Sequence, residues 1–255
     1  MVVVVVGAHG QLGQALQHIA VHYPTVQCHF YTSDEIDITQ VATIELVWRQ
    51  LKPDFCINAA AYTAVDKAES ESDKATLINV DGARNLATIC QQFNTTLLHI
   101  STDFVFDGSK TTPYLESDIT NPQSVYGTTK RDGELAIINT MQAYFIIRTS
   151  WLYSQFGNNF MKTMLRLAHE KTSLSVVDDQ IGSPTHAVDL AAMLMTIIQS
   201  KSTAYGIYHF SNQGNTSWYG FAQKIFELNK VLIPLHPIAT AQYPTPAKRP
   251  QYSVL

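Results

Sequence analysis

The chain has 255 residues, of which 45% are hydrophobic and 15% are charged, and its formal net charge is −4. This length suits one globular unit or two closely joined ones, with enough apolar side chains for a core. The slight acidity excludes the basic surfaces that draw proteins to nucleic acids or anionic membranes, so we expect neither as a partner.

Residues 2–6 are five consecutive valines, which fit a secretory signal, a membrane span or a buried strand. A span needs about 20 apolar residues, and a signal peptide needs a basic start and a longer apolar core. β-Branched side chains favour extended backbone, and a run without polar alternation is typical of a parallel strand covered on both faces. We therefore predict a central strand and a cytoplasmic protein.

Strands and helices alternate over the first 150 residues. Helices are predicted at 11–22, 41–51, 73–93 and from 123, and further strands at 27–31, from 55, at 96–101 and at 144–151. This βαβα order predicts an α/β fold with a Rossmann-like, doubly wound parallel sheet. We assign residues 1–150 to this NADP(H)-binding domain.

Beyond residue 150 the alternation loosens. Helices are predicted at 159–170, 186–200 and 217–229, and short strands at 174–177 and 206–210, with proline-bearing loops between them. We assign residues 151–255 to a smaller, interleaved C-terminal lobe that binds the substrate.

The cysteines and histidines show no metal-binding pattern. The three cysteines, Cys28, Cys56 and Cys90, lie in apolar stretches without CxxC spacing, and the nine histidines form no HExxH pattern. The odd cysteine count favours buried thiols in a reducing compartment. We predict no metal site.

Gly7, Gly10 and Gly13 form a GxxGxxG pattern between the first strand and the first helix. Glycine there permits a tight turn, close approach of a pyrophosphate and close helix–strand packing, and the helix N-terminus offers free N–H groups. The alternative is a turn that merely needs positive φ. The spacing is typical of extended short-chain dehydrogenases, so we predict a dinucleotide cofactor.

The second strand leaves the choice of dinucleotide open. An acidic residue at its end favours NAD, but here Tyr31, Thr32 and Ser33 precede Asp34. Hydroxyl groups tolerate a 2′-phosphate, although no arginine is present to pair with it. We predict NADPH, with NADH as the alternative.

Tyr126 and Lys130 form the one YxxxK pair in the chain, at the start of the helix after the fourth strand. At this spacing both side chains share a helix face, where an ammonium lowers the pKa of a phenol. Tyr126 is then a candidate general acid toward a carbonyl that receives hydride. Thr102, at the preceding strand end, is placed to bond the same carbonyl. The alternative is a surface lysine beside a half-buried tyrosine.

The chain resembles the dTDP-4-dehydrorhamnose reductase family along its whole length. The matching stretches are GAHGQLG, DIT, PDFCINAAAYTAVDKAE, STDFVFDG, VYGTTKRDGE, RTSWLY, GNNFMKTMLRLA, VVDDQIGSPT and YPTPAKRP. The resemblance implies reduction of the 4-keto group of dTDP-4-dehydro-β-L-rhamnose by NAD(P)H, the last step of dTDP-L-rhamnose synthesis. It also implies a possible homodimer, since some members are held as dimers by a metal ion between the subunits. We assign no carboxylate cluster of this chain to such a metal.

The resemblance further implies three sets of site residues. The implied catalytic set is Thr102, Tyr126 and Lys130. The implied cofactor set is Gly7, His9, Gly10, Gln11, Leu12, Asp37, Ile38, Ala59, Ala60, Tyr62 and Lys130. The implied substrate set is Asp103, Trp151, Asn158, Asn159, Gln180, Thr185 and Arg249.

Simpler structural roles compete with several of these assignments. Asp37 equally suits a helix N-cap, and Asn158 and Asn159 equally suit caps of the next helix. Trp151 equally suits a large core side chain. Arg249 can pair bidentately with a diphosphate or lie solvated near the chain end.

Two departures from the family pattern carry expectations. Members usually continue beyond the RP segment through further helical chain, whereas this sequence stops at Leu255. We expect a missing helix to expose apolar surface or weaken substrate binding. Phe104 stands where tyrosine is common, which we expect to be a mild change.

Two other functions fit the same motifs. One is a non-catalytic, NADP-binding subunit that resembles the β subunit of methionine adenosyltransferase. The other is a nucleotide-sugar epimerase or dehydratase, which shares the tyrosine and lysine but regenerates its tightly held NAD.

Overall fold

A parallel six-stranded sheet forms the centre of the computed structural model, which describes residues 1–255. The strand order is β10-β5-β4-β3-β1-β2, and every neighbouring pair is parallel. The predicted doubly wound α/β sheet is confirmed. The strands are β1 (Val2–Val6), β2 (Gln27–Tyr31), β3 (Phe55–Asn58), β4 (Thr96–Thr102), β5 (Tyr144–Thr149) and β10 (Gly206–His209).

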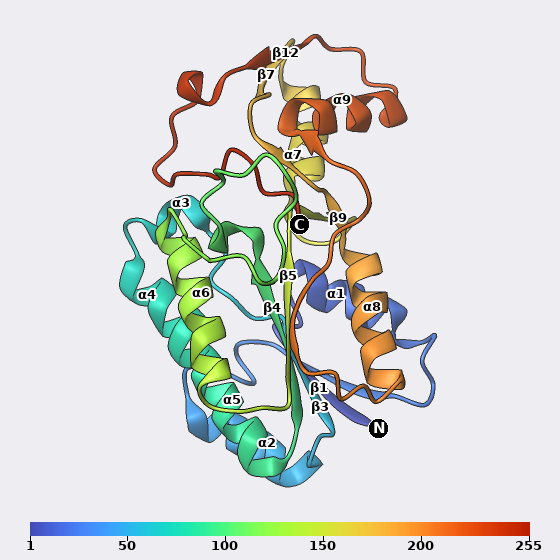
Figure 1. Ribbon diagram of the computed structural model, residues 1–255. Coiled ribbons are helices and arrows are strands. Elements are labelled where there is room, and N and C mark those ends of the chain that lie inside the picture. Colours follow the sequence, from blue (N-terminus) through green and yellow to red (C-terminus); the bar gives the residue numbers. More distant parts are fainter.

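The valines of β1 alternate between two cores, one on each face of the sheet. Val3 and Val5 pack with helices α1 (Gln11–Ala20) and α8 (Ala187–Gln199). Val4 and Val6 face the opposite core, which the helices α2, α5 and α6 close (Figure 1). A strand covered on both faces needs apolar side chains at every position, which explains the run of valines. These three helices are α2 (Val41–Leu51), α5 (Gly82–Phe93) and α6 (Val125–Ile138).

The helix predicted at 73–93 is interrupted. It consists of α4 (Ser72–Thr76), a π-helical turn (Leu77–Asp81) and α5, and a short helix α3 (Val65–Ala68) precedes it. A π turn inserts an extra residue and frequently marks a functional site. Here it turns Asn79 toward the loop that follows β3.

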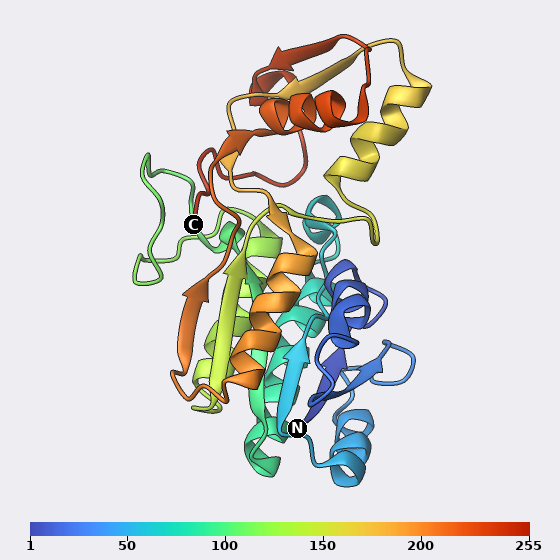
Figure 2. The ribbon, with the colours of Figure 1, turned by 90° about the vertical axis from the view of Figure 1, so that its right-hand side faces the viewer.

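A smaller lobe lies beyond the carboxyl ends of the sheet strands (Figure 2). Its apolar core joins helices α7 (Phe160–Glu170) and α9 (Trp218–Asn229) to the paired strands β7 (Leu174–Val177) and β12 (Leu235–Ile238). Two short strand pairs accompany them: β6 (Leu152–Tyr153) with β9 (Thr185–His186), and β8 (Ile181–Gly182) with β11 (Thr216–Ser217).

The two lobes share the chain rather than dividing it at residue 150. The chain leaves the smaller lobe to form α8 and β10, which complete one face and one edge of the large sheet, and then returns (Figure 1). The boundary between 150 and 151 therefore stays a prediction, with α8 and β10 belonging structurally to the sheet. No helix has the length and apolarity needed to cross a membrane.

Candidate active site

The glycine loop is built from close backbone contacts. Gly7 has a φ of +83°, and a Cβ there would lie 2.6 Å from the nitrogen of Ala60. A Cβ on Gly13 would overlap the carbonyl oxygen of Gly7. No side chain caps α1, and its first turn contains no acidic residue. The positive end of the helix dipole is therefore free for an anion, so the loop fits a dinucleotide pyrophosphate.

The other predicted residues of this loop differ in exposure. His9 and Gly10 are exposed, whereas Leu12 is buried in the core of the first face. Gln11 bridges to the smaller lobe: its Nε2 donates to the Leu152 carbonyl oxygen at 3.0 Å, and its Oε1 accepts from Asn159 Nδ2 at 2.7 Å. The loop is thus joined directly to the chain that enters the second lobe.

Asp37 and Ile38 precede α2 without capping it. Asp37 Oδ1 accepts from the backbone N–H of Thr39 at 2.9 Å and from its hydroxyl at 2.8 Å. The N-cap position is Gln40, so the alternative that Asp37 caps the helix is wrong. Ile38 is buried against Gly82.

The loop after β3 carries three more predicted cofactor residues: Ala59, Ala60 and Tyr62. Asn79 of the π turn clamps this loop, because its Oδ1 accepts from Tyr62 N at 2.8 Å and its Nδ2 donates to Tyr62 O at 3.2 Å. The same Nδ2 donates to Thr129 Oγ1 at 3.0 Å. The π turn therefore holds the loop against the helix that carries Tyr126 and Lys130.

Thr102 and Tyr126, predicted as catalytic, meet at the carboxyl end of β4. The Thr102 hydroxyl lies near enough to the Tyr126 phenol to lower its pKa. Thr102 Oγ1 also donates to Asp103 Oδ1 at 3.0 Å and accepts from Phe104 N at 3.2 Å. Both Thr102 and Asp103 are buried, whereas Tyr126 is half-buried.

Lys130 lies one turn further along α6 and is buried, with 2% of its surface exposed. Its Nζ donates to the Ile100 carbonyl oxygen at 2.7 Å and lies 3.3 Å from His99 Nε2. The alternative of a surface lysine is therefore wrong. Nζ is directed at β4 rather than at the phenol of Tyr126.

Burial dominates the ionisation of these groups. It raises the pKa of Tyr126 to about 12, although the nearby Thr102 hydroxyl lowers it and the Asp103 charge raises it further. Burial also lowers the pKa of Lys130 to about 8, against the opposing charge of Glu134. The prediction that a neighbouring ammonium makes the phenol acidic is wrong here, because burial raises the pKa of Tyr126 and the Lys130 Nζ is directed elsewhere.

Several polar residues around this centre were not predicted. Arg148 of β5 forms a buried, bidentate ion pair with Glu134 of α6. Arg148 Nη2 lies 2.7 Å from Glu134 Oε2, and Arg148 Nε lies 3.0 Å from Glu134 Oε1. Ser101 donates to the same carboxylate. Asn58 and His99 form a second buried pair beside Lys130. The sequence could have indicated these residues, because they are polar side chains inside otherwise apolar strands.

The predicted substrate residue Trp151 adopts a φ of +47°, a left-handed backbone that is unfavourable for a bulky residue. Its ring stacks on that of Trp218, with centroids 3.5 Å apart and planes 7° from parallel. A Cβ on Gly182 would collide with the Trp151 ring at 2.5 Å. Trp151 is half-buried and packs against the apolar core of the smaller lobe, so the alternative of a large core side chain stays open.

Three further predicted substrate residues lie near the junction of the lobes. Asn158 is exposed. Asn159 caps α7, since its Oδ1 accepts from Lys162 N at 3.1 Å, and the capping alternative is confirmed for this residue. Thr185 is buried, and its hydroxyl has no hydrogen-bond partner.

Gln180 and Arg249 line a cavity of about 530 Å³ in the smaller lobe, together with Trp218 and apolar residues of α7 and β7. Trp218 Nε1 donates to Gln180 Oε1 at 3.2 Å, and Gln180 Nε2 donates to Thr240 Oγ1 at 3.0 Å. Arg249 forms two hydrogen bonds with Asp66, at 3.0 and 2.7 Å. Its guanidinium fork is therefore already paired.

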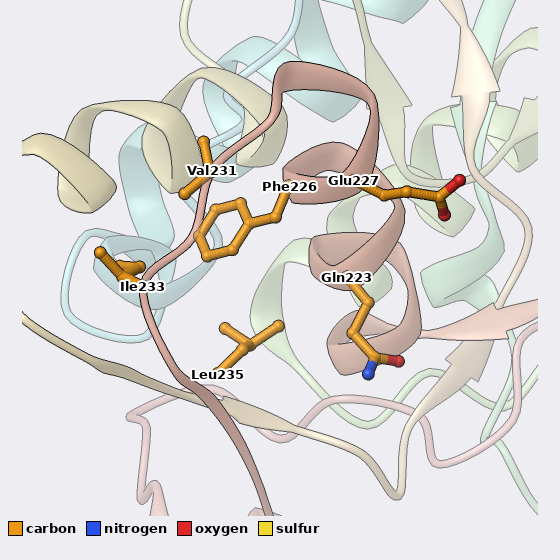
Figure 3. Close-up of a pocket in the computed structure, with 6 residues that line it drawn as sticks. All are labelled: Gln223, Phe226, Glu227, Val231, Ile233 and Leu235. Atoms are coloured by element: carbon orange, nitrogen blue, oxygen red, sulfur yellow. The ribbon is translucent and has the colours of Figure 1, made fainter.

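A second hollow of about 430 Å³ lies beside α9. Figure 3 shows Phe226 facing Val231, Ile233 and Leu235 there, with Gln223 and Glu227 also on its rim. No residue predicted from the sequence lines it. The polar cluster at the carboxyl end of β4, rather than this hollow, is therefore the candidate active site.

The comparison with protein families decides the assignment. A family model described as "RmlD substrate binding domain" matches residues 1–255. The chain belongs to this RmlD family. The predicted resemblance is confirmed.

Its RmlD relatives share most of their length with the chain. The dTDP-4-dehydrorhamnose reductase of Aggregatibacter actinomycetemcomitans is 44% identical over 98% of this chain and 89% of its own. The Bacillus anthracis reductase, solved in complex with NADP, is 41% identical and superposes with a TM-score of 0.96, covering 100% of this chain and 89% of that one. A Clostridium acetobutylicum reductase is 42% identical and superposes with a TM-score of 0.96. The match covers 100% of this chain and 90% of that one.

Proposed function

We propose that this protein is an NADPH-dependent dTDP-4-dehydrorhamnose reductase, which reduces the 4-keto group of dTDP-4-dehydro-β-L-rhamnose. The contact between Thr102 and Tyr126 beside the buried Lys130 carries the proposal. RmlD relatives named for this activity match over nearly the whole chain, and one of them was solved with NADP. This favours the reductase over the regulatory subunit.

Tyr126 is placed to act as the general acid. Its raised pKa of about 12 keeps the phenol protonated at neutral pH, which is the form that a ketone reduction consumes. The phenol proton passes to the oxygen of the former carbonyl as that oxygen gains negative charge. The Thr102 hydroxyl, which donates to Asp103 in this structure, would turn its proton to the same oxygen when substrate binds and stabilise the developing charge.

Lys130 and the glycine loop complete the chemistry. When bound, NADPH supplies the hydride. The loop 7–13 and the residues 59–62 would hold it, with His9, Asp37 and Ile38 as further predicted contacts. Lys130, whose Nζ is directed at β4 rather than at the phenol, would contact the nicotinamide ribose of the bound cofactor.

The cavity that Gln180 and Arg249 line is proposed to receive the nucleotide part of the substrate. Its apolar lining and the adjacent stack of Trp151 and Trp218 suit a flat base, whereas Arg249 would have to leave Asp66 before it could pair with a phosphate. Asp103, Asn158, Asn159 and Thr185 remain predicted substrate contacts. The cytoplasmic location and the homodimer also stay predictions.

Y126F tests the assignment of the acid. We expect kcat to fall by about 100-fold or more while NADPH binding is retained, because only the proton donor is removed. The measurement follows the reduced-nicotinamide absorbance with dTDP-4-dehydrorhamnose, using NADPH and NADH in parallel. Y144F, at the opposite end of the sheet, is the matched control.

The same assay separates the other functions. NADPH binding by the wild-type protein without turnover favours the regulatory subunit, and product formation without cofactor consumption favours an epimerase or dehydratase. Near-normal turnover by Y126F contradicts the role of Tyr126.

A further inference from the structure

His99 is a buried polar residue in the middle of the apolar strand β4. Its side chain is 1% exposed and contacts two polar groups, one at each ring nitrogen. Nδ1 lies 3.0 Å from Asn58 Nδ2, and Nε2 lies 3.3 Å from Lys130 Nζ. The ring therefore stands between the strand β3 and the lysine of the active site.

Asn58 determines which ring nitrogen carries the proton. The backbone N–H of Ala60 donates to Asn58 Oδ1 at 3.1 Å, and because an N–H only donates, the oxygen must face Ala60. The Asn58 amide nitrogen then faces His99 and donates to Nδ1. A neutral imidazole that accepts at Nδ1 carries its proton at Nε2.

This tautomer directs an N–H at the Lys130 amine. Nζ lies between that donor and the Ile100 carbonyl oxygen, which accepts from it at 2.7 Å. An ammonium there meets a second donor in the His99 N–H and keeps the Ile100 carbonyl oxygen as its acceptor, whereas a neutral amine also accepts a hydrogen bond from that N–H. The other charged groups near Nζ are Glu134 on the same helix and Arg148, which pairs with Glu134.

The ionisation of both groups agrees with this arrangement. Burial lowers the pKa of His99 well below its usual value, and the Lys130 charge lowers it further. Burial lowers the pKa of Lys130 to about 8. Both groups thus favour their neutral forms more than they would in water.

We propose that His99 is a positioning residue for Lys130: its Nε2–H, oriented by Asn58, offers the ammonium no acceptor and so leaves Nζ directed at the Ile100 carbonyl oxygen. The inference rests on the proposed reductase function and extends it. The chain Ala60–Asn58–His99–Lys130 connects the loop that is predicted to contact the cofactor with the lysine. A shift of that loop is thereby transmitted to Nζ.

The first experiment needs no catalysis. The wild-type protein, labelled with ¹⁵N-histidine and free of cofactor, is compared by NMR with H99Q to assign the His99 signals. We expect a proton on Nε2, a non-protonated Nδ1 and no titration of this ring down to pH 5. A proton on Nδ1, or titration near pH 6.5, overturns the proposal.

The second experiment compares H99L and H99Q in the NADPH-driven reduction. We expect H99L to lower kcat by about 10-fold to 100-fold, because the lysine is misplaced, with KM for the sugar nucleotide within about threefold. H99Q restores most of the rate, since its amide N–H reaches the same position. H29L, which removes a half-buried histidine from β2, is the control.

The pH profile separates positioning from a packing defect. Without the opposing N–H, Lys130 keeps its proton to higher pH, so the loss of kcat on the alkaline side moves upward in H99L and not in H99Q. Equal losses in both variants with unshifted profiles overturn the proposal. An inactive wild-type protein refutes the reductase function instead, and the NMR result still decides the tautomer.

Discussion

At the scale of single residues, Asp103 shows what the site costs in stability. It is 2% exposed, and burial raises its pKa to about 6 despite the hydrogen bond from Thr102 and the lowering effect of the nearby Ser253 hydroxyl. The folded carboxyl group binds its proton more tightly than the unfolded one. Stability therefore falls as the pH rises from about 4 to about 6, and the deficit of about 3 kcal/mol persists above that window.

D103N removes this charge and tests the cost. We expect the free energy of unfolding to rise by up to about 3 kcal/mol at pH 7.5 and by less than about 1 kcal/mol at pH 4, since the wild-type carboxyl is mostly protonated there. Urea titrations at the two pH values measure it, with the exposed D73N as control. A gain that is equal at both pH values contradicts the assignment.

At the scale of elements, the sequence predicts the elements that local patterns determine and misses those that tertiary contacts determine. The bounds of α2, β2 and β7 agree with the predicted ranges, because apolar periodicity and a nearby proline or glycine are local signals. The π turn was missed because Asn79 is placed by its contacts with Tyr62 and Thr129, which lie far from it in sequence.

The site divides in the same way. The motifs predicted that Thr102 and Tyr126 share one strand end, and the structure brings them together. The His99–Lys130 contact depends on the register of β3 and β4 and on the position of α6, so no spacing along the chain indicates it. The i,i+4 spacing likewise does not reveal that burial controls the Tyr126 pKa.

G133A tests the contact between α6 and the π turn. Alanine favours a helix over glycine by about 1 kcal/mol, but a Cβ on Gly133 would overlap the Asn79 carbonyl oxygen. We expect a net loss of about 1–3 kcal/mol from this overpacking, together with reduced activity because the clamp on Tyr62 shifts. Thermal and urea unfolding measure it against D132A on the same helix. An increase in stability contradicts the prediction, because it shows that the Asn79 backbone moves away from the added Cβ at little cost.

At the scale of the whole molecule, a few polar contacts hold the lobes together. Gln11 joins the glycine loop to residues 152–159, and the ion pair of Asp66 with Arg249 ties the final segment to α3. The last residues then run along the 107–114 segment, where Tyr114 N donates to Val254 O at 2.8 Å.

D66A releases Arg249. Because the pair is partly exposed, we expect a stability loss of about 1 kcal/mol or less, but faster amide hydrogen exchange in residues 245–255 and a raised KM for the sugar nucleotide. Mass-spectrometric exchange measures the first effect and steady-state kinetics the second. K67A, an exposed neighbour, is the control, and an unchanged exchange pattern in D66A refutes the anchoring role.

The late arrival of β10 and α8 has a consequence for biosynthesis. Six of the 18 buried residues in the core of the first sheet face come from α8, and β10 supplies the outer neighbour of β5. A chain that has emerged only as far as residue 150 therefore presents an uncovered apolar face and an open strand edge, both of which invite aggregation until α8 and β10 follow.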